Sequence, residues 1–361
     1  MDSSDDRLHL RGARSFVAGR FESVARETFD DGWTPEEKDE RELQTSVAIE
    51  RARTILSHND SPDVGFDRSI NPYRGCEHGC IYCYARPSHA YLELSPGLDF
   101  ETRLYAKTNA AELLREALAK PGYAPKPIAL GANTDCYQPI ERKYKITRQI
   151  LEALVECEHP VTMVTKSALI ERDLDLLTDL SSKNLVKVFV SIGTLDRVLA
   201  RKLEPRAASP QRRIDILRKL SSSGVPCGVM VAALIPALND KTLERVLEAA
   251  AAAGAREAAY VIMRLPHELK ALFKDWLAAH YPERAEHVIS IVRQMRGGRD
   301  NDPSFDTRMT GTGSYAELIE KRFDIACRRY GLNDHGAGRN PPELDCSHFR
   351  PPSRHGQMTL F

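Results

Sequence analysis

Between about residues 66 and 265, short apolar runs alternate with longer stretches in which apolar residues recur at helical spacing. Strands separated by helices in this way indicate βαβ units and a parallel sheet. The predicted strands are Pro127–Thr134, Pro160–Lys166, Val186–Ile192, Val225–Leu234 and Glu257–Met263. The predicted helices are Thr108–Ala119, Lys145–Cys157, Glu171–Leu180, Pro210–Ser222 and Asp240–Ala252.

The number of these units predicts the fold class. A further strand just before Cys76 brings the total to about six, which predicts an α/β fold with a partial (β/α)6 barrel of the TIM type. A flat, doubly wound sheet is the alternative. We divide the chain into an N-terminal extension (1–60), a core (61–290) and a C-terminal extension (291–361), in which the helix Ser314–Tyr330 precedes an irregular tail.

The composition is that of a globular protein. Hydrophobic residues make up 42% and charged residues 28% of the 361 positions. No run reaches the roughly 18 apolar residues of a membrane span, and the N-terminus lacks the apolar core of a signal peptide. We therefore expect a cytoplasmic protein with no membrane partner. Lys and Arg together number 51, as do Asp and Glu, so any contact with a polyanion must come from a local patch.

Two segments nevertheless carry charge of mainly one sign. Residues 1–60 contain fourteen Asp or Glu against nine Lys or Arg, which predicts a mobile extension, with a belt packed on the core as the alternative. The segment Arg197–Lys219 is strongly basic. It suggests either a phosphate-facing rim or solvated helix faces, and Glu204-Pro205-Arg206 within it suggests a salt-bridged loop. The candidate rim residues are Arg201, Lys202, Arg206, Arg212 and Arg213.

Three cysteines carry the most specific chemistry. Cys76, Cys80 and Cys83 form a C-x3-C-x2-C spacing after an apolar strand and a turn. Three thiolates on one loop can hold three irons of a four-iron cluster and leave the fourth iron open to a ligand. The alternative is a structural zinc site that takes His78 or a distant cysteine as its fourth ligand.

The wider string SINPYRGCEHGCIYCYAR, from Ser69 to Arg86, resembles the signature of the radical S-adenosylmethionine (SAM) superfamily. In particular it is similar to the branch around spore photoproduct lyase and its bacterial relatives. The resemblance implies a [4Fe–4S] cluster whose open iron is chelated by the amine and carboxylate of SAM. It also implies an electron donor such as flavodoxin or ferredoxin, reductive cleavage of SAM, and a 5′-deoxyadenosyl radical that removes a substrate hydrogen.

Reactive groups of a barrel gather at the C-terminal ends of its strands, and this sequence offers several there. The strand ending in GANTD supplies Asn133 and Asp135, the next ends with Lys166, and the fourth contains Ser191. The SAM amine needs acceptors such as Asp135 or the Asn133 carbonyl, and its carboxylate needs a cation such as Lys166. The resemblance supports Lys166 and Ser191 as SAM contacts and places the peptide next to Tyr82 beside the adenine.

One departure from the lyase concerns its hydrogen-donating cysteine, because Ala132 stands at that position here. If the strand continues, Ala132, Thr134 and Cys136 share one face, so Cys136 is a candidate hydrogen donor. A small buried residue is the alternative reading of Cys136.

The last five residues, Gln357–Phe361 (QMTLF), resemble the short peptide that binds the bacterial sliding clamp. Together with the lyase resemblance they predict a repair-like enzyme that acts on DNA or another nucleic acid. Two alternatives remain at this point. One is a radical SAM enzyme for a peptide or small metabolite, and the other is a non-enzymatic iron–sulfur or zinc protein.

Overall fold

The computed structural model describes residues 11–22, 44–335 and 343–352. Its main sheet has the order β10-β9-β8-β7-β6-β3-β2, and all neighbouring pairs are parallel except β2 with β3. Six parallel strands confirm the predicted α/β fold. Within the described residues β10 and β2 are unpaired edges, so the barrel is not closed. The strands are β2 Leu56–His58, β3 Arg68–Ile70, β6 Ile128–Leu130, β7 Val161–Thr165, β8 Val186–Ser191, β9 Cys227–Leu234 and β10 Glu257–Ile262.

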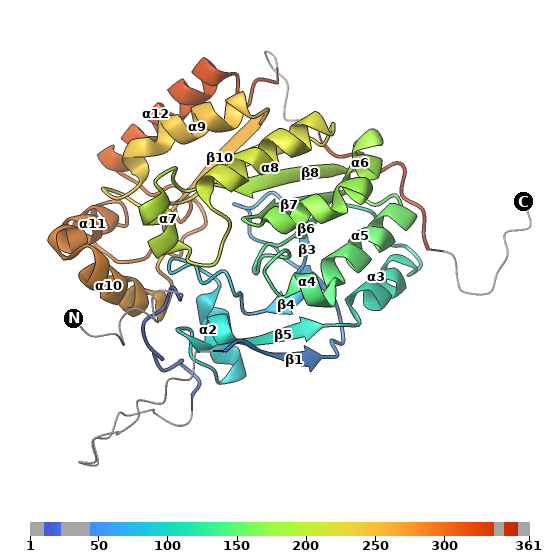
Figure 1. Ribbon diagram of the computed structural model, residues 1–361, viewed down its shortest axis with the longest axis horizontal. Coiled ribbons are helices and arrows are strands. Elements are labelled where there is room, and N and C mark those ends of the chain that lie inside the picture. The colour runs from blue at the N-terminus through green and yellow to red at the C-terminus, as the bar shows by residue number, and fades with distance from the viewer. Residues whose placement is uncertain (1–10, 23–43, 336–342, 353–361) are drawn as a thin grey trace, which may run out of the picture.

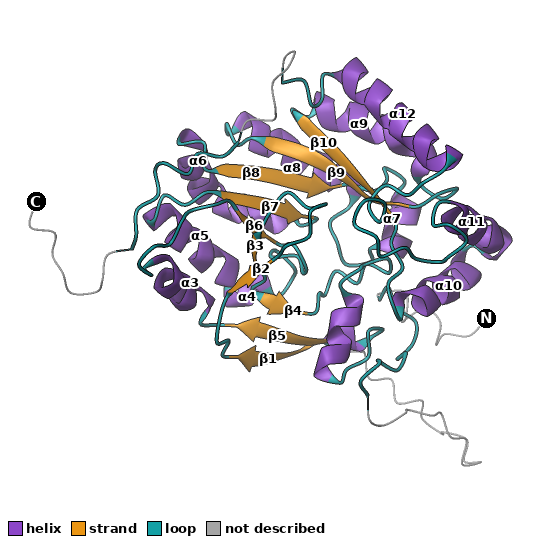
Figure 2. Ribbon diagram, turned by 180° about the vertical axis from the view of Figure 1, so that it is seen from behind, coloured by secondary structure: helices purple, strands orange, loops and turns teal. Residues whose placement is uncertain are grey.

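Helices between the parallel strands cover one face of this sheet, and the strands are seen directly from the other side (Figures 1 and 2). Each buries an apolar stripe in the main core, as the sequence pattern predicts. These helices are α3 Ala110–Leu118, α5 Ile146–Glu156, α6 Leu174–Ser182, α8 Pro210–Ser222 and α9 Leu243–Ala252. The helix predicted at Ser314–Tyr330 is α12 and packs on α9.

A second, three-stranded sheet was not predicted. It has the order β1-β5-β4, with bounds Ser46–Glu50, Arg103–Lys107 and Tyr73–Arg74. β4 lies between β3 and Cys76, so the strand expected directly before the cysteines is in fact two short strands in different sheets. The N-terminal extension is described over residues 11–22 and 44–60. The first of these parts packs on the core, as the alternative of a packed belt predicts, because the backbone N–H groups of Gly12 and Ala13 donate to Glu101.

Several further helices complete the chain. Two of them, α10 Leu269–His280 and α11 Pro282–Gln294, form a second core with Ile81 and Tyr82 of the cysteine loop. Trp276 of α10 lies in this core. This pair of helices was not among the predicted elements. The short helices are α2 Asp99–Thr102, α4 Glu141–Tyr144, α7 Arg197–Leu203, η1 Arg86–Leu92, η2 Ala168–Asp173 and η3 Asp240–Thr242. No helix among the described residues is long and apolar enough to cross a membrane.

Candidate functional site

The three cysteines lie on a tightly turned loop that follows β4. The N–H of Cys76 donates to the carbonyl of Phe100 at 2.9 Å, and the N–H of Cys83 donates to that of Cys80 at 3.2 Å. Gly79 turns the loop with φ +69°, and a Cβ there would lie 2.6 Å from Oε2 of Glu101. Only glycine combines this conformation with so close an approach.

The thiols themselves are poorly solvated. Cys76 and Cys80 are each 8% exposed, and Cys83 is half-buried. Burial raises the pKa of Cys80 to about 12 and that of Cys76 well above its usual value, and the neighbouring thiols add to both shifts. Such thiols ionise readily only when a cation replaces the missing water, which is what coordination to a metal does.

In donor type and number the three thiols therefore fit three irons of a cluster. Within the described residues, however, no three Cys, His, Asp or Glu side chains are already gathered in the arrangement of a metal site. His78, the alternative zinc ligand, lies with Nδ1 3.3 Å from Oδ2 of Asp135 and is 2% exposed.

A buried guanidinium supports this loop from below. Arg86 is fully buried and donates to the carbonyls of Gly79 (3.1 Å) and Cys80 (2.9 Å). It also donates to two further carbonyls, those of Pro96 and Gly97, and to the buried carboxylate of Glu101. All five donors of the guanidinium are thus satisfied.

Asp135, a predicted acceptor for the SAM amine, is already engaged by the protein. Oδ1 accepts from the N–H of Tyr137 and the hydroxyl of Thr165, and Oδ2 accepts from the N–H of Lys166 at 2.8 Å and faces His78. A carboxylate has about four acceptor sites, so little capacity remains for an amine. The structure makes Asp135 a connection between the ends of β6 and β7.

This arrangement predicts a pH-dependent contribution to stability. Burial alone would raise the pKa of Asp135, but His78 and the backbone N–H groups lower it to about 2. A depressed pKa stabilises the fold above the unfolded value near 3.8, and the stabilisation is lost as the pH falls towards 2. Asp135→Asn should therefore cost about 2 kcal/mol at pH 7 and almost nothing near pH 2, measured by urea unfolding. A cost that does not change with pH would contradict this assignment.

Lys166 points at the cysteine loop. Its Nζ lies 5.9 Å from the centre of the Tyr82 ring. Burial alone would lower the pKa of Lys166, but the nearby Cys80 and Glu204 raise it. The structure thus brings together three of the predicted residues, Lys166, Tyr82 and Cys80, with the cation fixed beside the thiols.

Two residues that the sequence analysis did not assign to the site hold Tyr82 and Lys166 in place. Glu204 accepts from the hydroxyl of Tyr82 and from Nη2 of Arg213, and all three side chains are buried. Arg213 also donates to the carbonyl of Ser191 at 2.9 Å. What marks Glu204 and Arg213 as supporting residues is that they are charged and buried. Because burial cannot be read from the sequence, they could not be predicted.

The remaining SAM candidates lie at the expected strand ends. Ser191, at the end of β8, is 1% exposed and donates to the carbonyl of Ala232 at 3.1 Å. Asn133 is exposed, and its backbone N–H donates to Oδ1 of Asn71 at 2.8 Å. Its side chain is therefore presented to solvent beside the cysteine loop.

The prediction that one strand face carries Ala132, Thr134 and Cys136 is wrong, because β6 ends at Leu130. Gly131 leaves the strand with φ +87°, and a Cβ there would lie 2.7 Å from the carbonyl oxygen of Val164. Cys136 is 0% exposed and packs in the main core. This burial agrees with the alternative reading of Cys136 as a small buried residue.

Three of the five candidate rim residues in Arg197–Lys219 are paired within the protein, whereas Arg201 is exposed and Lys202 lies over the ring of Tyr281. Arg213 is buried with Glu204, Arg206 pairs with Glu77 at 2.7 Å, and Arg212 pairs with Glu171 at 2.8 Å. The prediction of a salt-bridged loop at Glu204-Pro205-Arg206 is confirmed by the first two of these pairs.

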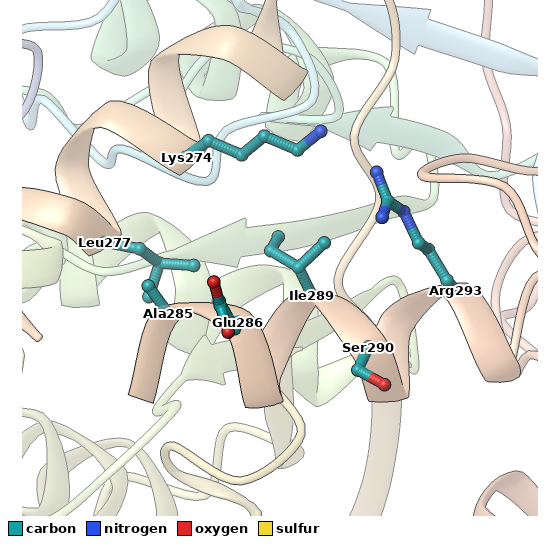
Figure 3. Close-up of a pocket in the computed structure, with 7 residues that line it drawn as sticks. All are labelled: Lys274, Leu277, Ala285, Glu286, Ile289, Ser290 and Arg293. Atoms are coloured by element: carbon teal, nitrogen blue, oxygen red, sulfur yellow. The ribbon is translucent and has the colours of Figure 1, made fainter. Parts of the chain in front are cut away.

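A surface groove lies between α10 and α11, and no cysteine lines it (Figure 3). Both of its cations, Lys274 and Arg293, are paired with Asp300. Its lining offers no thiol or carboxylate cluster for catalysis. The lining residues are Lys274, Leu277, Ala285, Glu286, Ile289, Ser290 and Arg293.

Comparison with known proteins identifies the same region. The family model of the radical SAM superfamily matches residues 70–250. An uncharacterized protein of Mycobacterium tuberculosis is 35% identical over 286 residues, which cover 78% of this chain and 79% of that protein. An uncharacterized protein of Methanocaldococcus jannaschii is 28% identical over 198 residues, 55% of this chain and 72% of that one.

Among solved structures, spore photoproduct lyase complexed with dinucleoside spore photoproduct matches with a TM-score of 0.59 and 15% identity, over 81% of this chain and 82% of that chain. A double mutant of the lyase with bound AdoMet and the same dinucleoside matches with a TM-score of 0.55 and 16% identity, over the same shares. At this level of identity the likeness concerns the fold.

Proposed function

The chain belongs to the radical SAM superfamily, and we propose that Cys76, Cys80 and Cys83 hold its [4Fe–4S] cluster. Enzymes of this superfamily bind such a cluster together with SAM. The observation that carries the proposal is the placement of three buried or half-buried thiols on one loop, next to the cation of Lys166. Three thiolates leave one iron free for SAM.

The residues around the loop have separate tasks in binding SAM. Lys166 binds the carboxylate, since its ammonium is held near the loop by Cys80 and Glu204. Asn133 is the remaining acceptor for the amine, because the oxygens of Asp135 are occupied. Ser191 and Tyr82 border the nucleoside, and the buried Glu204 and Arg213 keep Tyr82 in position.

When bound, the reduced cluster supplies the electron that breaks the sulfonium C–S bond of SAM, giving methionine and the radical that removes a substrate hydrogen. The electron comes from a donor such as flavodoxin or ferredoxin, in a reducing, cytoplasmic compartment. The chain's own contribution is to orient SAM and to exclude water around it.

The substrate class we propose is nucleic acid, with a repair-like reaction. The fold likeness to a lyase solved with a dinucleoside photoproduct supports it. The sliding-clamp peptide, Gln357–Phe361, lies outside the described residues. If it serves that purpose, deleting it should abolish binding to the bacterial clamp and leave SAM cleavage unchanged. A peptide or metabolite accepted in place of every nucleic acid tried would overturn the nucleic-acid proposal.

The experiment that tests the radical chemistry is anaerobic reconstitution with iron and sulfide, followed by SAM, a strong reductant and an assay for 5′-deoxyadenosine. We expect product from the unaltered chain and none from Cys83→Ala. Cys346→Ala is the matched control, because Cys346 is a half-buried thiol outside the loop. Zinc in place of iron, with no cleavage of SAM, would contradict the proposal.

Replacing Lys166 by Met should weaken SAM binding about tenfold to a hundredfold, because a charge-assisted hydrogen bond contributes about 1.5–3 kcal/mol. Iron content should stay unchanged, since Lys166 is not a ligand. The measurement is SAM titration of the reconstituted protein by calorimetry. Lys183→Met, at an ion pair with Glu158, is the control and should bind SAM normally. An equal loss in both variants would remove Lys166 from the SAM site.

A further inference from the structure

The open side of the barrel is bridged by one ion pair. The sheet runs from β10 at one edge to β2 at the other (Figure 2). Arg308 belongs to the segment that follows α11, and this segment is fastened to β10 by the N–H of Ile262, which donates to the carbonyl of Met309 at 2.8 Å. Arg308 donates from Nε and Nη2 to both carboxylate oxygens of Asp63, in the loop between β2 and β3.

A second guanidinium lies beside this pair, and no carboxylate among the described residues forms an ion pair with it. Arg264 follows β10, and its Nε is buried with no hydrogen-bond partner. In the part of the chain that the structure describes, the contact of Nη1 is with the sulfur of Met309, at 3.8 Å. Burial and the neighbouring Arg308 both lower the pKa of Arg264, so the two cations repel one another.

Two other charged groups of this region, Arg296 and Asp302, are already used. Arg296 is 3% exposed and donates to the carbonyls of Thr307 and Met263. Asp302 accepts from the hydroxyls of Thr307 and Ser304. Two adjacent guanidinium groups thus share one carboxylate, Asp63. A partly buried cation without a partner costs stability, and such costs are characteristic of binding sites.

The unpaired guanidinium is next to the cysteine loop. It lies over the ring of Tyr84, 5.6 Å from the ring centre, and Tyr84 directly follows Cys83. The hydroxyl of Tyr84 donates to the carbonyl of Ala132 beyond β6. Tyr84 therefore connects the segment that follows β6 with the segment that follows β10, and it is 47% exposed. An anion held by Arg264 would lie beside the place where SAM and substrate meet.

We propose that Arg264 and Arg308 form a subsite for a phosphodiester group of a nucleic-acid substrate, and that Asp63 occupies Arg308 until the substrate arrives. The inference rests on the proposed function and specifies how that site holds its substrate. Guanidinium groups bind phosphate oxygens in pairs of parallel hydrogen bonds, the same geometry that Asp63 now uses.

The test is fluorescence anisotropy of a labelled twelve-nucleotide DNA, single-stranded and duplex, with reconstituted protein and no SAM. Arg264→Gln should weaken binding about tenfold, and Arg264→Lys should recover part of the loss. The slope of log Kd against log salt should fall by about 0.7–0.9 for each phosphate that the variant no longer binds. Arg328→Gln, at an exposed position on α12, is the control and should change neither quantity.

Asp63→Asn gives a prediction of opposite sign. It removes the competing carboxylate, so it should tighten DNA binding about threefold to tenfold even if it weakens the fold. A purely structural role of the ion pair predicts weaker binding instead. With DNA whose linkages are uncharged methylphosphonates, Arg264→Gln should no longer weaken binding. If the variant weakens binding of this DNA just as much, Arg264 contacts a base or another anion, and the proposal is overturned.

Binding and SAM cleavage are measured separately, so their failures are distinguishable. If the protein binds neither form of DNA, or if Arg264→Gln and Asp63→Asn leave the Kd unchanged, this inference is wrong. Formation of 5′-deoxyadenosine would then still support the radical chemistry.

Discussion

Replacing Arg86 by Met should lower the free energy of unfolding by about 3–5 kcal/mol and release the cysteine loop. Arg86 and Glu101 are both 0% exposed, so removing the cation leaves a buried carboxylate without its ion-pair partner. The same change frees the carbonyls of Gly79 and Cys80, which the guanidinium now fixes. Arg86→Met should therefore retain less iron than the unaltered chain after reconstitution.

Urea unfolding and iron content measure these two effects. The matched control is Arg115→Met, because Arg115 pairs with Glu156 on the surface, where the side chains are 35% and 40% exposed. An exposed pair contributes at most about 1 kcal/mol, so this variant should unfold nearly as the unaltered chain does. Equal losses for Arg86 and Arg115 would show that the buried pair is not what supports the loop.

The fold and the three-cysteine loop were predictable because their signals are local. The strands β7 to β10 and the helices between them follow from apolar periodicity within windows of about ten to eighteen residues. The spacing of Cys76, Cys80 and Cys83 is contained in eight consecutive residues. By contrast, β4 has two residues and pairs with β5, so it leaves no periodic pattern to detect.

The supporting residues could not be predicted, because burial and long-range pairing define them. Glu204 meets Tyr82 across 122 positions, and Arg86 meets Glu101 across fifteen. In the sequence they are ordinary charged residues, which usually lie on the surface. The error in the length of the strand before Cys136 has a different cause. We extended β6 past Gly131, whose positive φ and close approach to Val164 turn the chain away and bury the thiol.

Replacing Glu204 by Gln should also cost about 3–5 kcal/mol, although the side chain keeps its size. Gln can still accept from the hydroxyl of Tyr82, but it leaves Arg213, whose side chain is 2% exposed, without a counter-charge. Lys166 would then face a second uncompensated cation, because Glu204 now contributes to the raised pKa of Lys166. The cost should be seen in urea unfolding of the protein without iron, so it does not depend on a bound cluster.

A double-mutant cycle separates the charge from the packing. Because Arg213→Met removes the uncompensated cation, the double variant Glu204→Gln/Arg213→Met should be more stable than Glu204→Gln alone by about 2 kcal/mol or more. Glu244→Gln, at the more exposed pair with Arg322, is the control and should cost less than about 1 kcal/mol. Strictly additive losses at Glu204 and Arg213 would mean that the two charges do not compensate one another. The position of Tyr82 and Lys166 beside the thiols would then depend on side-chain packing and not on charge.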